Sequence, residues 1–183
     1  MLLDVQDPEV LRLLDQYLRL LHLPQSQLRI TTNRATFQRW LGRRVSASLG
    51  GAYIFLPQIG EHAILINLPR IDRAKPKALE IVVAEELIHM RDHLDGDHRR
   101  HAKHGYDRIA VRVARLTGAT LDEVRSCLIP LERRPFRYLY ACPRCGASVR
   151  RRRKGTWSCG LCSPRFDSRF VLQLVKELTV DQP

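Results

Sequence analysis

The N-terminal part of the chain alternates apolar and polar positions with the period of an α-helix. Asp7-Pro8 is a typical N-cap followed by proline at the first helical position, and an apolar stripe follows it. The residues of this stripe are Val10, Leu11, Leu14, Leu18 and Leu21. The pattern predicts a packing helix over residues 8–23. A short strand is expected over residues 27–32 and a short helix over residues 35–41.

Two apolar runs in the next part of the chain predict strands. Residues 45–56 alternate at first and contain the pair Gly50-Gly51, and residues 63–68 form an apolar run after a glycine-containing turn. Runs of this length joined by a short turn are typical of an antiparallel pair. The glycine pair predicts a bulge or a tight turn. His62 is expected at the surface of the turn.

The longest helical pattern covers residues 78–94, which contain no internal proline or glycine and follow Pro76. Its apolar residues recur at helical spacing and should be buried on one face; they are Leu79, Val82, Val83, Leu87 and Met90. Residues 106–116 resume helical spacing, and Gly118 is a typical helix stop. A capping box at residues 120–123 begins another short helix. Helix, strands and further helices in this order predict an α+β domain.

Chain length and composition indicate one ordinary domain followed by a small module. The 183 residues are 44% hydrophobic and 27% charged, as in globular proteins. We place the domains at 1–130 and 131–183, with a linker over residues 130–137. No run approaches the roughly 20 apolar residues of a membrane helix, and the N-terminus lacks the pattern of a signal peptide. We therefore expect no membrane partner and a cytoplasmic location, nucleoid-associated or, in a eukaryote, nuclear.

The positive charge is concentrated in the C-terminal part of the chain. The formal net charge is +12, and residues 131–183 hold 12 basic and 4 acidic residues, which leaves +4 for residues 1–130. Only five of the 31 basic residues are lysine. Because the planar guanidinium group suits phosphate, this asymmetry predicts a nucleic acid, most simply DNA, as a partner. The alternative is a solvated basic surface.

Four of the five cysteines form two C-x-x-C pairs. The pairs are Cys142-Pro-Arg-Cys145 and Cys159-Gly-Leu-Cys162, with 13 residues between them. This spacing is typical of a structural zinc site with four thiolate ligands. The fifth cysteine, Cys127, lies among apolar residues and is expected to be a buried core residue.

A run of basic residues with nearby aromatic residues lies between the two cysteine pairs. The run is Arg150, Arg151, Arg152, Arg153 and Lys154, and Trp157 follows it. A basic loop with aromatic rings can neutralise phosphates and stack on bases, so these six residues are our candidate nucleic-acid contacts. Alternatively, Trp157 and Tyr140 form the small core that such a module needs.

Three ionisable residues of the helix over residues 78–94 share one flank. Glu85 and His89 are four residues apart, and Glu86 lies three residues before His89. Burying such groups is costly unless they are paired or bind a metal. The pattern is one residue short of H-E-x-x-H, in which two histidines hold zinc and the glutamate is the general base. Glu85 stands at the place of the first histidine, and Glu85, His89 and His93 are a second possible ligand set.

These motifs together resemble the SprT/Spartan family of zinc metallopeptidases. The resemblance covers most of the sequence. It is carried by Trp40, Gly50-Gly51, Ile66-Asn67-Leu68, the helix that ends at His89, His104-Gly105, Tyr140 and the four-cysteine ribbon. Members are zincins that bind DNA, and the best-studied ones degrade proteins crosslinked to DNA.

The resemblance implies a fold, a ligand set and a base. The fold is a minimal zincin-like domain, with helices and a small antiparallel sheet, followed by a zinc ribbon. His89 and His104 become metal ligands, Glu85 takes the first ligand place, and Glu86 becomes the general base. His101 is the substitute if His104 is not used. Two zinc ions are then expected, one structural in the ribbon and one at the variant active site.

The expected function is that of a DNA-associated, SprT-like zinc metallopeptidase that hydrolyses peptide bonds in nucleic-acid-bound proteins. A carboxylate in place of a neutral imidazole removes about one unit of positive charge and should slow hydrolysis at neutral pH. The alternative is therefore a weak or inactive pseudo-peptidase that binds DNA or RNA through the ribbon. A transcription-factor-like zinc protein is a third possibility, but it leaves the N-terminal domain without a purpose.

Overall fold

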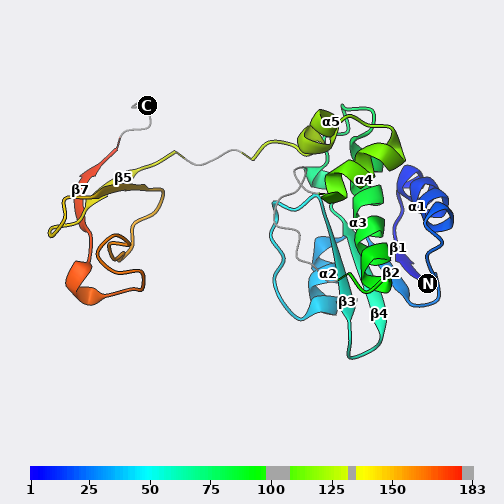
Figure 1. Cartoon of the computed structure of the whole chain (residues 1–183), viewed down its shortest axis with the longest axis horizontal. Helices are drawn as coiled ribbons and strands as arrows, with labels where there is room; N and C mark the ends of the chain where they lie inside the picture. The colour runs from blue at the N-terminus through cyan, green and yellow to red at the C-terminus, as the bar shows by residue number, and fades with distance from the viewer. Residues whose placement is uncertain (98–107, 132–134, 179–183) are drawn as a thin grey trace. The chain divides into compact units, whose positions relative to one another are not determined.

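The structure is a computed structural model that describes residues 1–97, 108–131 and 135–178. The chain divides into two compact units, Met1–Pro130 and Leu131–Pro183 (Figure 1). No helix in the described part of the chain is long and apolar enough to cross a membrane. His98, His101 and His104 lie outside the described residues, so the ligand roles expected of the last two stay predictions.

The first unit combines α-helices with one four-stranded sheet in the described residues. Its helices are α1 (Pro8–Leu20), α2 (Arg34–Leu41), α3 (Ala78–Leu94), α4 (Arg108–Thr117) and α5 (Leu121–Ser126), with a 3-10 turn, η1 (Leu68–Arg70). Its strands are β1 (Leu2–Asp4), β2 (Leu28–Thr31), β3 (Gly51–Leu56) and β4 (Glu61–Ile66). The predicted α+β class is confirmed.

The sheet has the strand order β1-β2-β4-β3. β3 and β4 form the predicted antiparallel pair, in unbroken register from Gly51↔Ile66 to Leu56↔Glu61. The other pairings, β1 with β2 and β2 with β4, are parallel, so the sheet is mixed. Parallel pairing joins segments that are distant in sequence, and periodicity alone does not reveal it. β3 stands at one edge of the sheet.

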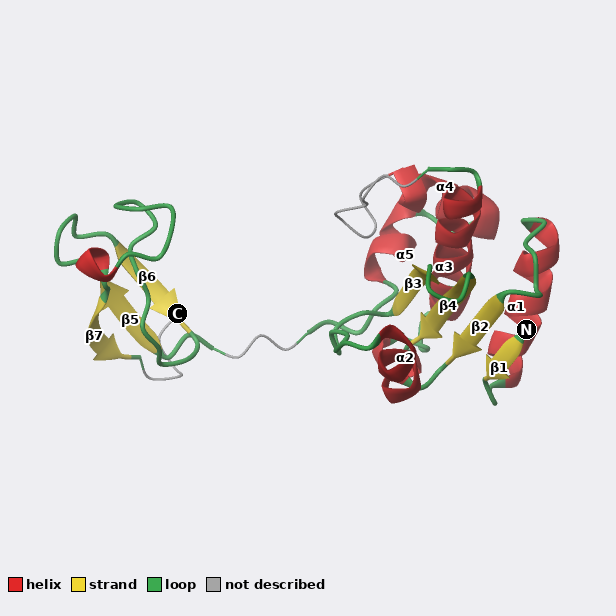
Figure 2. Cartoon of the chain, turned by 90° about the horizontal axis from the view of Figure 1, so that it is seen from below, coloured by secondary structure: helices red, strands yellow, loops and turns green. Residues whose placement is uncertain are grey.

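Helices cover both faces of this sheet (Figure 2). α1 and α3 pack on one face, where Val10, Leu13 and Tyr17 of α1 join the largest core cluster. α2 packs on the other face, where Phe37 is buried against Ala63 and Leu65. Each large apolar side chain buried in this way contributes about 1.5–3 kcal/mol. Because α3 is buried on most sides, it is the central element of the unit.

Local sequence rules set the ends of three helices as predicted. The Asp7 carboxylate accepts hydrogen bonds from the backbone N–H groups of Glu9 and Val10 at the start of α1. The Thr120 hydroxyl and the Glu123 carboxylate form the predicted capping box of α5. Gly118 adopts a left-handed conformation with a φ of 64° just after α4.

Two sequence-based expectations about β3 and β4 were wrong. The glycine pair forms no bulge in β3, because the register from Gly51 onward is unbroken. A Cβ atom at Gly51 would lie 2.4 Å from Oε1 of Glu86, so close approach to α3 excludes a side chain there. His62 is not at the surface: it lies on β4, and only 3% of it is exposed.

The second unit is a small three-stranded antiparallel sheet with the order β6-β5-β7. The strands are β5 (Tyr138–Ala141), β6 (Ser148–Arg151) and β7 (Gln173–Glu177), and a 3-10 turn, η2 (Ser168–Phe170), precedes β7. Its small core contains Tyr140, Phe170 and Leu172, together with Cys142 and Cys159. Tyr140 is therefore a core residue.

Candidate zinc centre and active-site helix

The four ribbon cysteines come together as a metal-binding group. Their sulfur atoms all lie within 4.8 Å of one another. The Sγ atoms of Cys142 and Cys162 are 3.8 Å apart, and those of Cys145 and Cys159 are 3.6 Å apart. Four ligands on a tetrahedron with Zn–S bonds of about 2.3 Å have edges of about 3.8 Å. The thiol positions therefore fit a zinc ion, and the four cysteines can bind one.

The backbone around each cysteine pair forms the tight turn that this geometry needs. The N–H of Gly146 donates to the carbonyl of Cys142 at 2.9 Å, with Gly146 in the left-handed region. The N–H groups of Cys162 and Ser163 donate to the carbonyl of Cys159. Each pair thus presents two sulfur atoms from one short turn.

The thiol environment makes one cysteine ready to bind a metal at neutral pH. Backbone N–H groups of Cys145 and Arg144 are directed at the Cys142 sulfur, and the former makes the larger contribution to lowering the pKa of Cys142 to about 6. Desolvation by burial, the largest cause, raises the pKa of Cys162 to about 12. Binding of a metal ion must therefore displace a proton from Cys162.

In the first unit, α3 carries the three ionisable residues that the sequence singled out. Glu85 and Glu86 are buried, with exposed fractions of 9% and 6%, and His89 is half-buried. All three residues belong to α3, the helix that packs beside the edge strand β3 (Figure 1). The fourth residue of the predicted site, His104, lies outside the described residues, so the structure does not test the complete ligand set.

The Glu86 side chain lies directly against the backbone of β3. A Cβ atom added to Gly51 would come within 2.9 Å of Oε1, Cγ and Cδ of Glu86. The start of β3 is itself fixed, because the Asn67 side-chain amide donates to the carbonyl of Leu49 at 2.6 Å, and the Asn67 N–H donates to Gly50. The start of β3, against which the Glu86 carboxylate lies, is therefore fastened to the end of β4 through Asn67.

The alternative ligand set on α3 is not brought together. Within residues 1–97, 108–131 and 135–178, the ribbon cysteines are the one group of three or more potential ligands whose donor atoms converge. Glu85, His89 and His93 do not form such a group. The His93 ring instead packs beside Phe55, with ring centroids 4.6 Å apart.

A cluster of rings between β3, β4 and α3 was missed by the sequence analysis. The Tyr53 hydroxyl and Nδ1 of His62 are 2.9 Å apart, and the His62 and His93 ring centroids are 5.6 Å apart. Burial of His62, and secondarily the charge of His93, lowers the pKa of His62. The strand alternation could have revealed this cluster, because Tyr53 and Phe55 are two residues apart on one face of β3.

A buried ion-pair network was also missed. Asp92 on α3 is 5% exposed and accepts hydrogen bonds from Arg108 and Arg112 of α4. Arg108 also donates to Asp97. The network ties the C-terminal end of α3 to the start of α4, on either side of the residues that the structure does not describe.

The basic run of the ribbon occupies β6 and the turn after it. Arg150 is exposed, whereas Arg151 is half-buried with its guanidinium group 4.7 Å from the ring centre of Trp157. Trp157 packs against the ribbon core. Lys154 pairs with Glu177 of β7 at 2.5 Å. The exposed arginines of this basic run are Arg150, Arg152 and Arg153.

Comparison with known proteins gives one informative match. No family model and no solved structure matches the chain. The chain is similar to a protein named SprT-like from Lactiplantibacillus plantarum, with 31% identity over 116 residues. The match covers 62% of this chain and 72% of that relative. Together with the α3 motif and the four-cysteine cluster, this similarity shows that the chain belongs to the SprT-like family.

Proposed function

We propose that this chain is a nucleic-acid-associated zinc peptidase that hydrolyses peptide bonds in proteins bound to DNA. The observation that supports it most is the buried Glu86 carboxylate, which α3 holds against Gly51 of the edge strand. A carboxylate beside an edge strand can act on a peptide that pairs with that strand.

Each residue of the α3 motif has a distinct role in this proposal. Glu85 and His89 of α3, together with His104, would hold a zinc ion, which would supply Lewis acidity toward the peptide carbonyl. Glu86 takes a proton from the attacking water and transfers it to the leaving amine. The backbone of β3 orients the peptide, because its outer edge can donate and accept hydrogen bonds.

The Glu86 role can be tested with a fluorescent protein crosslinked to a DNA oligonucleotide. Glu86→Gln keeps the size of the side chain but removes the base, so cleavage should fall by about a hundredfold or more. Glu9→Gln, the same change on the exposed surface of α1, should leave cleavage unchanged. DNA-dependent cleavage by Glu86→Gln at the natural rate would refute the proposal.

The ribbon provides the nucleic-acid contact in this proposal. Arg150, Arg152 and Arg153 are exposed and can neutralise phosphates. In this proposal Trp157, which is half-buried and packs beneath Arg151, supports the basic strand.

Charge removal tests this contact. Replacing Arg150, Arg152 and Arg153 with glutamine should weaken DNA binding and flatten the dependence of log Kd on log salt by about 0.9 for each lost phosphate contact. Replacing Arg12, Arg19 and Arg39 of the first unit is the control with the same change of net charge. Equal loss of affinity in both variants would show that the ribbon has no specific role.

A second function is favoured by one observation. Glu85 is buried where a zinc peptidase has a neutral histidine, and a carboxylate there weakens the Lewis acidity of a bound metal. The chain would then be a nucleic-acid-binding protein that retains the peptidase fold. If Glu85→His creates cleavage that the natural chain lacks, this second function is correct.

A further inference from the structure

One segment of the first unit lacks acidic residues altogether. Between Asp15 and Glu61 the sequence contains six arginines and no aspartate or glutamate. Four of these arginines lie on α2 or just after it, namely Arg34, Arg39, Arg43 and Arg44. The first 130 residues carry only +4 in total, so this segment is a local concentration of positive charge.

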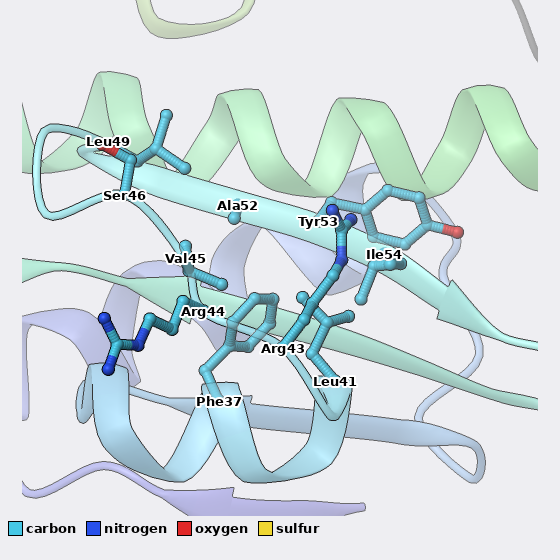
Figure 3. Close-up of a pocket in the computed structure, with 10 residues that line it drawn as sticks. All are labelled: Phe37, Leu41, Arg43, Arg44, Val45, Ser46, Leu49, Ala52, Tyr53 and Ile54. Atoms are coloured by element: carbon cyan, nitrogen blue, oxygen red, sulfur yellow. The ribbon is translucent and has the colours of Figure 1, made fainter. Parts of the chain in front are cut away.

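A cavity of about 190 Å³ lies beside these arginines, between α2 and β3. Figure 3 shows its apolar side chains gathered between α2 and the strand. The lining residues are Phe37, Leu41, Arg43, Arg44, Val45, Ser46, Leu49, Ala52, Tyr53 and Ile54. Ala52 and Ile54 alternate with Gly51 and Tyr53, so the cavity lies on the opposite face of β3 from Glu86.

The cavity is large enough for one apolar side chain. A cavity of about 150 Å³ lined by aliphatic and aromatic residues can bind benzene. A leucine or phenylalanine side chain from a partner would therefore fit here. The wall formed by the loop after α2 is held in place, because Gln38 accepts a hydrogen bond from the N–H of Val45 at 2.9 Å and Arg34 donates to the Val45 carbonyl.

Two guanidinium groups flank the apolar floor. Arg43 and Arg44 are exposed and follow Gly42, which ends α2 in a left-handed conformation. Their side chains extend on either side of Phe37 in Figure 3. Within the described ranges neither arginine forms an ion pair, and the lining contains no acidic residue. Charge complementarity at this cavity therefore calls for a partner with carboxylates or phosphates.

The neighbouring strand favours a peptide over a nucleic acid. β3 is an edge strand of the sheet, and its residues from Gly51 to Phe55 are only half-buried. An edge strand offers a row of backbone donors and acceptors that an added peptide strand can pair with. The cavity offers little to a base, because most of its lining is apolar and the Ser46 hydroxyl is engaged with Ser48.

We propose that the cavity between α2 and β3 is a docking site for an extended peptide in which an apolar side chain is flanked by carboxylates. The apolar side chain enters the cavity, and the carboxylates pair with Arg43 and Arg44. The site lies on the other face of β3 from Glu86, and the proposal holds whether or not Glu86 catalyses hydrolysis.

Fluorescence anisotropy of the full chain tests this docking site. The probe is a fluorescein-labelled ten-residue peptide with one central leucine and two glutamates on each side of it. The Glu86→Gln background prevents hydrolysis during the measurement. The Arg43→Gln/Arg44→Gln variant should bind the probe roughly five- to tenfold more weakly, as expected for two exposed ion pairs. The Arg12→Gln/Arg19→Gln variant, with the same change of net charge on α1, should bind it as the parent does.

Two further measurements decide the chemistry of the occupant. Replacing the central leucine of the probe with serine should weaken binding to the parent, because the cavity then stays unfilled. Equal binding of the serine probe, or equal binding by the two arginine variants, overturns the proposal. A single-stranded oligonucleotide whose affinity falls more with Arg43→Gln/Arg44→Gln than with the α1 variant would identify the occupant as nucleic acid, and would also overturn it.

Discussion

At the scale of single residues, the contact between Gly51 and Glu86 links the sheet to the proposed chemistry. Gly51 has an ordinary strand conformation, so backbone freedom does not explain the glycine. The reason is space: the Glu86 carboxylate occupies the volume that a Cβ atom would need. Gly51 is therefore explained by packing against the buried Glu86 side chain, and Gly50 by packing against Leu128, which lies 2.2 Å from the position of an added Cβ atom.

This explanation makes Gly51→Ala a sensitive test. The added methyl group must displace either Glu86 or β3, so we expect a loss of about 1–3 kcal/mol in the free energy of unfolding. Cleavage of the DNA-crosslinked protein should fall as well, because the base moves. Urea unfolding measures the first effect. If Gly51→Ala is as stable and active as the natural chain, the contact has no importance.

Residue-level predictions from sequence succeeded where the rule is local. The N-cap at Asp7, the capping box at Thr120 and the grouping of cysteines three positions apart depend on residues within a few positions of one another. His62 was misplaced because its neighbours form an apolar run, and such a run does not reveal whether a flanking histidine belongs to the turn or to the buried strand. Its environment is set by Tyr53 and by His93, which is 31 positions away.

At the scale of elements, the connection between α3 and α4 is held by charge. Asp92 is buried, and two arginines of α4 donate to its carboxylate, one to each oxygen atom. A buried carboxylate is stable only when its charge is compensated in this way. Arg108 and Arg112 are more than a third exposed, so solvent screens their share of the interaction.

Removing the charge of Asp92 should therefore destabilise the first unit moderately. We expect Asp92→Asn to lower the free energy of unfolding by about 1–3 kcal/mol, since the amide keeps the shape but cannot pair with both guanidinium groups. Asp95→Asn is the matched control, because Asp95 is exposed and pairs with Arg91 on the same helix. Thermal or urea unfolding of the two variants gives the comparison. Equal stability would mean that the network contributes nothing.

The pattern of apolar residues predicted two of the four strands of the first sheet as a pair, and it missed β1. β3 and β4 were predicted because a short turn joins them, and the turn itself indicates antiparallel pairing. β1 was not predicted, because Leu2–Asp4 is three residues long, exposed, and paired in parallel with a strand 27 positions away. The Asp92 network was missed for a similar reason, since its partners lie 16 and 20 positions along the chain. Contacts between residues so far apart in the sequence form only when the whole unit folds, so local sequence patterns do not predict them.

At the scale of the whole molecule, the two units differ in how firmly each supports a metal site. The ribbon brings all four ligands together, and its thiol positions match a tetrahedral zinc site. The first unit presents Glu85 and His89 on α3, and the remaining predicted ligand, His104, lies outside the described residues. The number of zinc ions per chain therefore distinguishes a peptidase from a binding protein with the same fold.

Acid should remove zinc from the ribbon in a defined pH range. The pKa of Cys142 in the metal-free ribbon is lowered to about 6, so this thiol stays ionised at pH values where an ordinary thiol is protonated. Its readiness to bind a metal is lost as the pH falls through about 6. Because protons compete with zinc for these thiolates, zinc retained at pH 7.5 should be released progressively as the pH of dialysis falls below about 6, as elemental analysis can measure. A zinc content that does not change as the pH falls would contradict a site made of these thiolates alone.

Elemental analysis at pH 7.5 also decides between the two functions. Two zinc ions per chain, of which one disappears in Cys159→Ser and the other in His89→Ala, would place a metal beside Glu86 and make hydrolysis chemically possible. The carboxylate of Glu85 would then reduce the rate, because it lowers the positive charge that polarises the peptide carbonyl. One zinc ion, lost in Cys159→Ser and unaffected by His89→Ala, would leave Glu86 without a Lewis acid. The chain would then act through its basic ribbon as a nucleic-acid-binding member of a peptidase family.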